Sequence, residues 1–174
     1  ASLPQTVSFS QGVFALFDEI GRSLRERSFP KLDRIEGYIV QNHSLLEDAL
    51  KLARMMDLKI SLDLASYNVV DQNREFLEEM LIEFVDIVFA NEDEARSLTG
   101  FEPPQALDRL SRLCEIAVVK VGKEGSLVSG RQSAVGGQQS AVSSQQYKIE
   151  AIPVTSVDTT GAGDLYASGF LYGI

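Results

Sequence analysis

The sequence predicts an α/β fold in which a mostly parallel sheet carries helices on both faces. Short β-rich runs alternate along the chain with stretches in which apolar residues recur at helical spacing. This order requires right-handed crossover connections between parallel strands. Residues 85–90 are apolar at every position except Asp86, which suits a strand that is covered on both faces. A chain of 174 residues with 44% hydrophobic side chains is long enough for one domain with a core.

The first half of the chain predicts three helices and two strands. Apolar residues at helical spacing predict a helix over residues 10–28, and Pro30 interrupts the chain after it. A capping box formed by Ser44 and Glu47 opens a second helix, and a third begins at Asp71. The β-rich runs between these helices predict strands over residues 35–40 and 59–64.

The second half predicts further strands and helices, ending in a helix that begins near Ala162. In chain order they are a strand over residues 85–90, helices over 91–98 and 104–113, a strand over 116–121, and a hairpin or edge pair formed by 125–128 and 147–152. Gly100 closes the first of these helices. Residues 129–146 are rich in Gln, Ser and Gly and repeat the tetrapeptide Gln-Ser-Ala-Val, which predicts a mobile loop or hairpin tip.

Composition excludes several classes of function. The formal net charge of −9 disfavours nucleic-acid binding, because an acidic surface repels phosphate backbones. A single cysteine, Cys114, permits neither an internal disulfide nor a cysteine metal site, and we expect a half-buried thiol at a helix end. The lone histidine, His43, is expected in a loop and argues against a Ser/His or Cys/His catalytic system. The sequence shows no membrane-spanning run and no signal pattern, so we expect a cytoplasmic protein without membrane partners.

Polar or glycine-rich segments follow three of the predicted strands. They are residues 63–66, 91–94 and 120–125. Ligands of open parallel sheets bind outside the carboxyl ends of the strands. The topology therefore predicts a ligand site at this edge of the sheet.

The segment 158–164, Asp-Thr-Thr-Gly-Ala-Gly-Asp, has the features needed for phosphoryl transfer. Its glycines let the backbone turn sharply and approach a ligand, and the helix that follows points free N–H groups at an anion. Asp164, in the first turn, could accept a proton from a hydroxyl group that attacks a phosphoryl group. The alternative is a threonine cap followed by an aspartate that merely favours the helix dipole.

This heptapeptide resembles the D-T-x-G-A-G-D motif of the ribokinase family, the PfkB carbohydrate kinases, whose superfamily includes adenosine kinase. The resemblance implies a ribokinase-like fold and an ATP- and Mg²⁺-dependent kinase for a sugar or nucleoside. It makes Asp164 the catalytic base and Gly161, Ala162 and Gly163 an anion hole. Asp158 would support the phosphate and metal region, and Thr159 would lie at the nucleotide.

Two further segments resemble motifs of the same family in the same order. Residues 91–94 are similar to its N-x-x-E motif, which implies that Asn91 and Glu94 act on Mg²⁺ through water, although the same pair also makes an ordinary capping box. Residues 120–125 are similar to its G-x-x-G loop, which places Gly122 and Gly125 along the nucleotide. Lys120 stands where many members have Thr, and a lysine there could contact phosphate or face solvent. Asp63 ends a strand at a place where the family often has an acidic or Asn residue near phosphate. The segment that it begins, residues 63–68, resembles adenosine-kinase-like members more than sugar kinases.

The resemblance covers the later part of a family member, from about Arg34 to Ile174. We therefore divide the chain into an unassigned helical segment, residues 1–30, and a ribokinase-like α/β catalytic portion, residues 31–174. The family's Gly-Gly substrate segment, its β lid and its adenine-contacting segments have no counterpart in the sequence. We expect an incomplete fold that is inactive by itself, with a non-catalytic nucleotide-binding module as the alternative. The sequence leaves the substrate and a homodimer open.

Overall fold

A computed structural model describes residues 32–131, 144–153, 159 and 161–174 of the chain. These residues form one six-stranded sheet in the sequential order β1-β2-β3-β4-β5-β6. The strands are β1 (Leu32–Glu36), β2 (Lys59–Asp63), β3 (Ile87–Asn91), β4 (Ile116–Lys120), β5 (Ser126–Arg131) and β6 (Ser144–Ile149). The first four are parallel, and β5 and β6 continue the sheet antiparallel. The predicted mostly parallel sheet and its terminal hairpin are thus confirmed.

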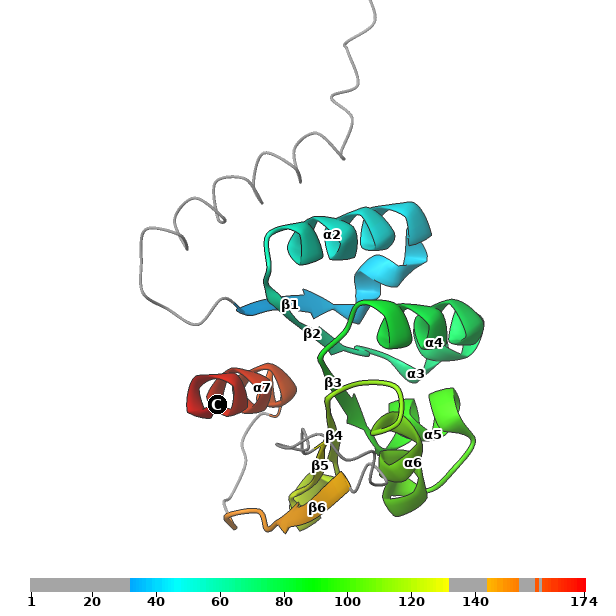
Figure 1. Cartoon of the computed structure of the whole chain (residues 1–174). Helices are drawn as coiled ribbons and strands as arrows, with labels where there is room; N and C mark the ends of the chain where they lie inside the picture. The colour runs from blue at the N-terminus through cyan, green and yellow to red at the C-terminus, as the bar shows by residue number, and fades with distance from the viewer. Residues whose placement is uncertain (1–31, 132–143, 154–158, 160) are drawn as a thin grey trace, which may run out of the picture.

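Helices cover both faces of this sheet, but unequally (Figure 1). They are α2 (His43–Met55), α3 (Tyr67–Gln72), α4 (Arg74–Glu83), α5 (Glu92–Thr99), α6 (Pro103–Leu110) and α7 (Ala162–Gly173), with 3₁₀ turns η1 (Gly37–Gln41) and η2 (Gly122–Glu124). Right-handed crossovers between parallel strands in sequential order place α2 to α6 on one face. The other face is covered by α7.

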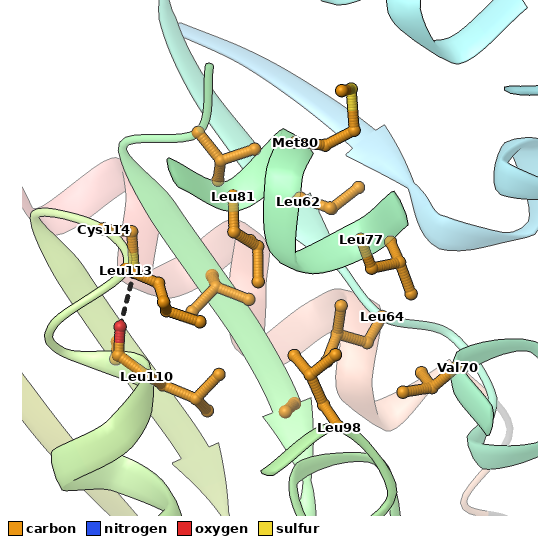
Figure 2. Packing of buried hydrophobic residues seen from close by; sticks show 14 of the residues in the cluster. Leu62, Leu64, Val70, Leu77, Met80, Leu81, Leu98, Leu110, Leu113 and Cys114 are labelled. Carbon is orange, nitrogen blue, oxygen red and sulfur yellow. Dashed lines mark hydrogen bonds between the residues drawn. The ribbon is translucent and has the colours of Figure 1, made fainter. Parts of the chain in front are cut away.

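Two apolar clusters follow from the alternation of side chains along the strands. The larger lies between the sheet and α2 to α6, and Figure 2 shows part of it, where Leu62 and Leu64 from β2 and the segment after it meet Leu77, Leu81 and Leu98 from the helices. The smaller one joins Ile87, Phe89, Val118 and Val128 on the other face to Ala167 of α7. Every buried side chain of about leucine size stabilises the fold by roughly 1.5–3 kcal/mol.

The strand predicted over residues 35–40 is wrong in its position. β1 ends at Glu36, which pairs with Asp63, the last residue of β2. Beyond that point β1 has no partner strand, and residues Gly37–Gln41 turn as a 3₁₀ helix. The apolar side chain of Val40 is fully buried in the large cluster instead of in the sheet.

The predicted start of the second helix and the predicted loop position of His43 are also wrong. Asn42 caps α2, because its Oδ1 accepts hydrogen bonds from Leu45 N at 3.2 Å and from Ser44 Oγ at 3.0 Å. His43 is the first residue of the helix. Its ring stacks on that of Phe76, with centroids 3.9 Å apart, and its Nε2 lies 2.7 Å from Asn73 Oδ1.

Other boundaries shift for local reasons. The helix predicted from Asp71 is two helices, α3 and α4, which separate at Asn73, whose side chain donates to Val69 O at 2.8 Å. Cys114 is buried, not half-buried, and its thiol donates to Leu110 O at 3.4 Å (Figure 2). The loop predicted over residues 129–146 is wrong at its ends, because pairing of β5 with β6 extends the strands over 129–131 and 144–146. The centre of that segment and the predicted helix over residues 10–28 lie outside the described residues. Among the described helices, none is long and apolar enough to cross a membrane.

Asp86, the polar exception in an apolar run, precedes β3 at the amino-terminal edge of the sheet. Its buried carboxylate accepts hydrogen bonds from Ile60 N at 2.8 Å and from Lys59 Nζ at 3.1 Å, and it pairs with Arg54. This charge is satisfied structurally, and it lies at the end of the strands away from the site described next.

Candidate active site

The alternation of side chains brings three polar residues to the α7 side of the sheet at its carboxyl edge. Asp63 ends β2 and is in register with Phe89, a residue that packs under α7. Asn91 ends β3 and is in register with Lys120, which ends β4. The polar residues that end these three strands therefore converge on one edge of the sheet, and the ligand site there stays a prediction.

Lys120 and Asp63 form a largely buried ion pair across β3. Lys120 Nζ donates to Asp63 Oδ2 at 3.0 Å, and the side chains are 18% and 6% exposed. The other oxygen, Asp63 Oδ1, accepts from Ala65 N at 3.3 Å. Ala65 itself has a φ of +64°, a left-handed conformation that an alanine adopts at a cost of roughly 1–2 kcal/mol. The turn after β2 thus holds the carboxylate in place.

The first turn of α7 lies beside this ion pair. Gly161 caps the helix with a φ of +75°, a conformation that favours glycine. A Cβ atom added to Gly163 would lie 3.2 Å from Lys120 Nζ, so the ammonium group lies beside the space that a side chain at this position would fill. Asp164 is exposed in the same turn. The N–H group of Ala162 donates to Thr159 O at 3.1 Å, within the turn itself.

Two contacts that sequence reasoning missed hold α7 in this position. The hydroxyl of Tyr166 lies 2.7 Å from Ser126 Oγ, which is fully buried on β5. The ring of Phe170 packs edge-on against Phe89 of β3, with centroids 5.5 Å apart. The only signal for this anchoring in the sequence was the spacing of Tyr166 and Phe170, which lie one helical turn apart.

Asn91 and Glu94 form a complete capping box at the start of α5. Asn91 Oδ1 accepts from Glu94 N at 2.9 Å, while Asn91 N and Nδ2 donate to the two carboxylate oxygens of Glu94, each at 2.8 Å. Burial raises the pKa of Glu94, the hydrogen bond from Asn91 lowers it, and the nearby charge of Asp63 raises it further. Within the described ranges no three His, Cys, Asp or Glu side chains form a metal cluster. Each carboxylate oxygen keeps a spare lone pair, which fits a water-mediated contact with Mg²⁺.

The two glycines of the predicted G-x-x-G loop have different surroundings. Gly122 has a φ of +52°, and the space where a Cβ would point is open. Gly125 has a φ of +99°, and its Cβ would lie only 1.9 Å from the carbonyl oxygen of Ile149 at the end of β6. Gly122 thus faces open space, whereas Gly125 is packed against the backbone that follows β6.

The structure brings together part of the predicted set of site residues. Lys120 Nζ lies beside the place where a side chain at Gly163 would start, Asp164 is the next residue of the same turn, and Glu94 is near enough to Asp63 and Lys120 for their charges to affect its pKa. Thr159 is exposed just before the turn. Asp158 lies outside the described residues. The roles of all these residues stay predictions, and what the geometry adds is that a cation and a helix N-terminus lie together.

Comparison with known proteins gives one family. Residues 32–174 match the model of the pfkB family carbohydrate kinases. The structure resembles adenosine kinase from Sinorhizobium meliloti with a TM-score of 0.69 and 32% identity, over 82% of this chain and 42% of that one. It also shares its fold, at a TM-score of 0.63 and 23% identity, with a candidate ribokinase II from E. coli in complex with ATP and Mg²⁺, over 81% of this chain and 44% of that one.

A curated relative extends the match to nearly the whole chain. Ribokinase from Lactococcus lactis subsp. lactis is 27% identical over 187 residues, which covers 99% of this chain and 55% of that protein. The chain thus spans about half the length of the relatives it matches.

Proposed function

Because the chain belongs to the pfkB family of carbohydrate kinases, we propose that it transfers the γ-phosphoryl group of ATP to a hydroxyl group of a sugar or nucleoside. The observation that carries the proposal is the position of Asp164. It lies in the glycine-opened first turn of α7 and directly follows Gly163, where a Cβ atom would lie 3.2 Å from Lys120 Nζ. A base, an anion-binding backbone and a cation at one point are the parts that phosphoryl transfer requires.

Asp164 is the proposed general base. Its exposed carboxylate takes the proton of the acceptor hydroxyl as that oxygen forms a bond to the γ-phosphorus and the bond from phosphorus to ADP breaks. Asp164 also lies in the first turn of α7, whose N-terminus carries a partial positive charge.

The turn at Gly161–Gly163 is the proposed anion hole. The backbone N–H groups of a helix N-terminus stabilise negative charge that develops on the transferred phosphoryl group. The N–H group of Ala162 donates to Thr159 O in this structure, and binding of a phosphoryl group would replace that contact. The dipole of the twelve-residue helix α7 adds to the attraction.

Mg²⁺, when bound, would neutralise part of the charge on the phosphates of ATP. We assign its water-mediated contacts to Asn91 and Glu94, whose capping box sits at the carboxyl edge of β3. Asp158, Thr159 and Gly122 would line the rest of the nucleotide. Gly125 shapes the loop, since the backbone after β6 fills the space beside it.

The acceptor is left as a class. The solved structure at 32% identity is an adenosine kinase and the curated relative at 27% is a ribokinase, so nucleosides and sugars both have support. A panel of nucleosides and sugars in an ATP-consumption assay separates them. The same assay on the 174-residue chain tests the prediction that it is inactive by itself.

The test of the base is Asp164→Asn in the complete protein. We expect the turnover number to fall by about 10²–10⁴-fold, which is the usual contribution of a general base, with ATP affinity and folding nearly unchanged. Asp48→Asn, at an exposed aspartate on α2, is the matched control and should keep full activity. Near-normal turnover in Asp164→Asn would refute the assignment.

A further inference from the structure

The ammonium group of Lys120 lies beside the proposed anion hole, and a second residue sets its position. Lys120 Nζ lies 3.2 Å from where a Cβ atom of residue 163 would be, and it donates to Asp63 Oδ2 at 3.0 Å. A lysine side chain normally keeps considerable rotamer freedom, and an ion pair that is 18% and 6% exposed removes much of it. The ammonium group is therefore held at one place before any ligand binds.

We propose that Asp63 is a positioning residue that holds the Lys120 ammonium over Gly163, where it binds the same terminal phosphoryl group as the N-terminus of α7. The inference rests on the proposed function, because it takes the turn at Gly163 as the phosphate site. Lys120 has three N–H donors, and Asp63 Oδ2 accepts one of them. The other donors are available to oxygen atoms of a phosphate.

The structure also gives a reason for glycine at position 163. Any side chain there would start 3.2 Å from Lys120 Nζ, closer than an ordinary carbon contact. The absence of a side chain lets the ammonium and the backbone N–H groups face the same point. A phosphoryl group there receives a full positive charge in addition to the partial charge of the helix.

The pairing of Asp63 with Ala65 supports the positioning role. Asp63 Oδ1 accepts a hydrogen bond from Ala65 N, and Asp63 Oδ2 accepts one from Lys120 Nζ. The first bond therefore fixes the orientation of the carboxylate that binds the lysine. Ala65 adopts a left-handed backbone conformation, which costs free energy. Residues with such strained backbones cluster at functional sites, which agrees with a positioning role for this turn.

The test measures binding of AMP, ADP and ATP by isothermal titration calorimetry in buffer with EDTA, so that affinity reports on the cations of the protein. Lys120→Met should weaken ATP binding by about 10- to 100-fold, as expected for a lost charge-assisted hydrogen bond, and leave AMP binding unchanged. Lys148→Met, at an exposed lysine on β6, is the matched control and should change neither. Equal ATP affinity in Lys120→Met and the wild type would overturn the inference.

A double-mutant cycle separates positioning from a structural role. Asp63→Asn should weaken ATP binding when Lys120 is present, because the ammonium loses its anchor. In the Lys120→Met background Asp63→Asn should cause no further loss, and this neutral pair also avoids an unpaired buried carboxylate. An equal loss in both backgrounds, or tighter ATP binding by Asp63→Asn alone, would overturn the positioning role.

The outcomes also separate this inference from the proposed function. If the wild type fails to bind ATP, the proposed function and the inference fall together. If the wild type binds ATP and Lys120→Met binds it equally well, the kinase assignment stands and only the role of the Asp63–Lys120 pair is refuted.

Discussion

The loop after β4 allows one prediction in which two glycines of the same motif behave differently. Gly125→Ala should be severely destabilising, and Gly122→Ala should be mild. The φ of +99° and ψ of −125° at Gly125 are the mirror image of an extended strand, which costs a residue with a side chain about 1–3 kcal/mol. The new Cβ would also overlap the carbonyl oxygen of Ile149 at 1.9 Å and Ala151 N at 2.8 Å.

These overlaps are with backbone atoms, which cannot swing aside as the end of a flexible side chain can. Relief requires the segment after β6 to move away from the loop, so we expect a total cost of about 4 kcal/mol. At Gly122 the space is open, and the φ of +52° costs an alanine about 1 kcal/mol. The expected difference between the two variants is therefore about 3 kcal/mol.

Urea unfolding followed by circular dichroism measures this difference. With a slope of about 2 kcal/mol per molar urea, the midpoint of Gly125→Ala should lie about 1.5 M below that of Gly122→Ala. Equal midpoints would refute the structural reading of Gly125. If the reading holds, Gly122→Ala is the variant that reports on nucleotide contacts of this loop, because it alone leaves the fold intact.

Three further outcomes are expected. Gly163→Val should weaken ATP binding, because its side chain would crowd Lys120 Nζ, while Gly169→Val, with open space beside it, should not; equal affinities would count against the anion site. Because burial raises the pKa of Glu94 above its ordinary 4.5, the stability it contributes is full below that pH and is lost as pH rises through the folded-state pKa. The unfolding free energy of the wild type relative to Glu94→Gln should thus be higher at pH 4.5 than at pH 7 in urea titrations, and the opposite trend would contradict the argument. Ser129→Ala should raise the unfolding free energy by about 1 kcal/mol in the same assay, since the buried hydroxyl has no hydrogen-bond partner among the described residues; a loss of stability would show that a partner exists.

Much of the architecture could be predicted because local patterns carried it. The alternation of β-rich runs with helical spacing correctly predicted a mostly parallel sheet and its hairpin. The capping box at Asn91 and the left-handed cap at Gly100 mark the two ends of α5 as expected. Both caps depend on hydrogen bonds between residues close in sequence, which local patterns can predict. The start of α7 at Ala162 followed from the glycine before it, Gly161.

The misplaced boundaries have a common physical cause. β1 ends at Glu36 because its partner β2 ends at Asp63, and strand pairing is not visible in the sequence of one strand. The cap of α2 is Asn42 instead of Ser44, and the packing of His43 on Phe76 from α4 accompanies this earlier start. In both places a contact between distant segments overrode a plausible local signal.

The sequence by itself determined which chemistry we propose for the chain and roughly where. Segment 158–164 specified a candidate base and a glycine turn, and polar residues after three strands specified the edge of the sheet, because both depend only on residue type and order. Tertiary structure alone decided which side chains meet. Asp63 and Lys120 are 57 residues apart and become partners only because β2 and β4 flank β3, and Lys120 reaches Gly163 only because α7 packs on that face. Tertiary packing also gave the two glycines of the loop after β4 different surroundings, since Gly125 lies against the end of β6 and Gly122 faces open space. Distances across a sheet depend on pairing and packing that are summed over the whole chain, and no single segment of sequence encodes them.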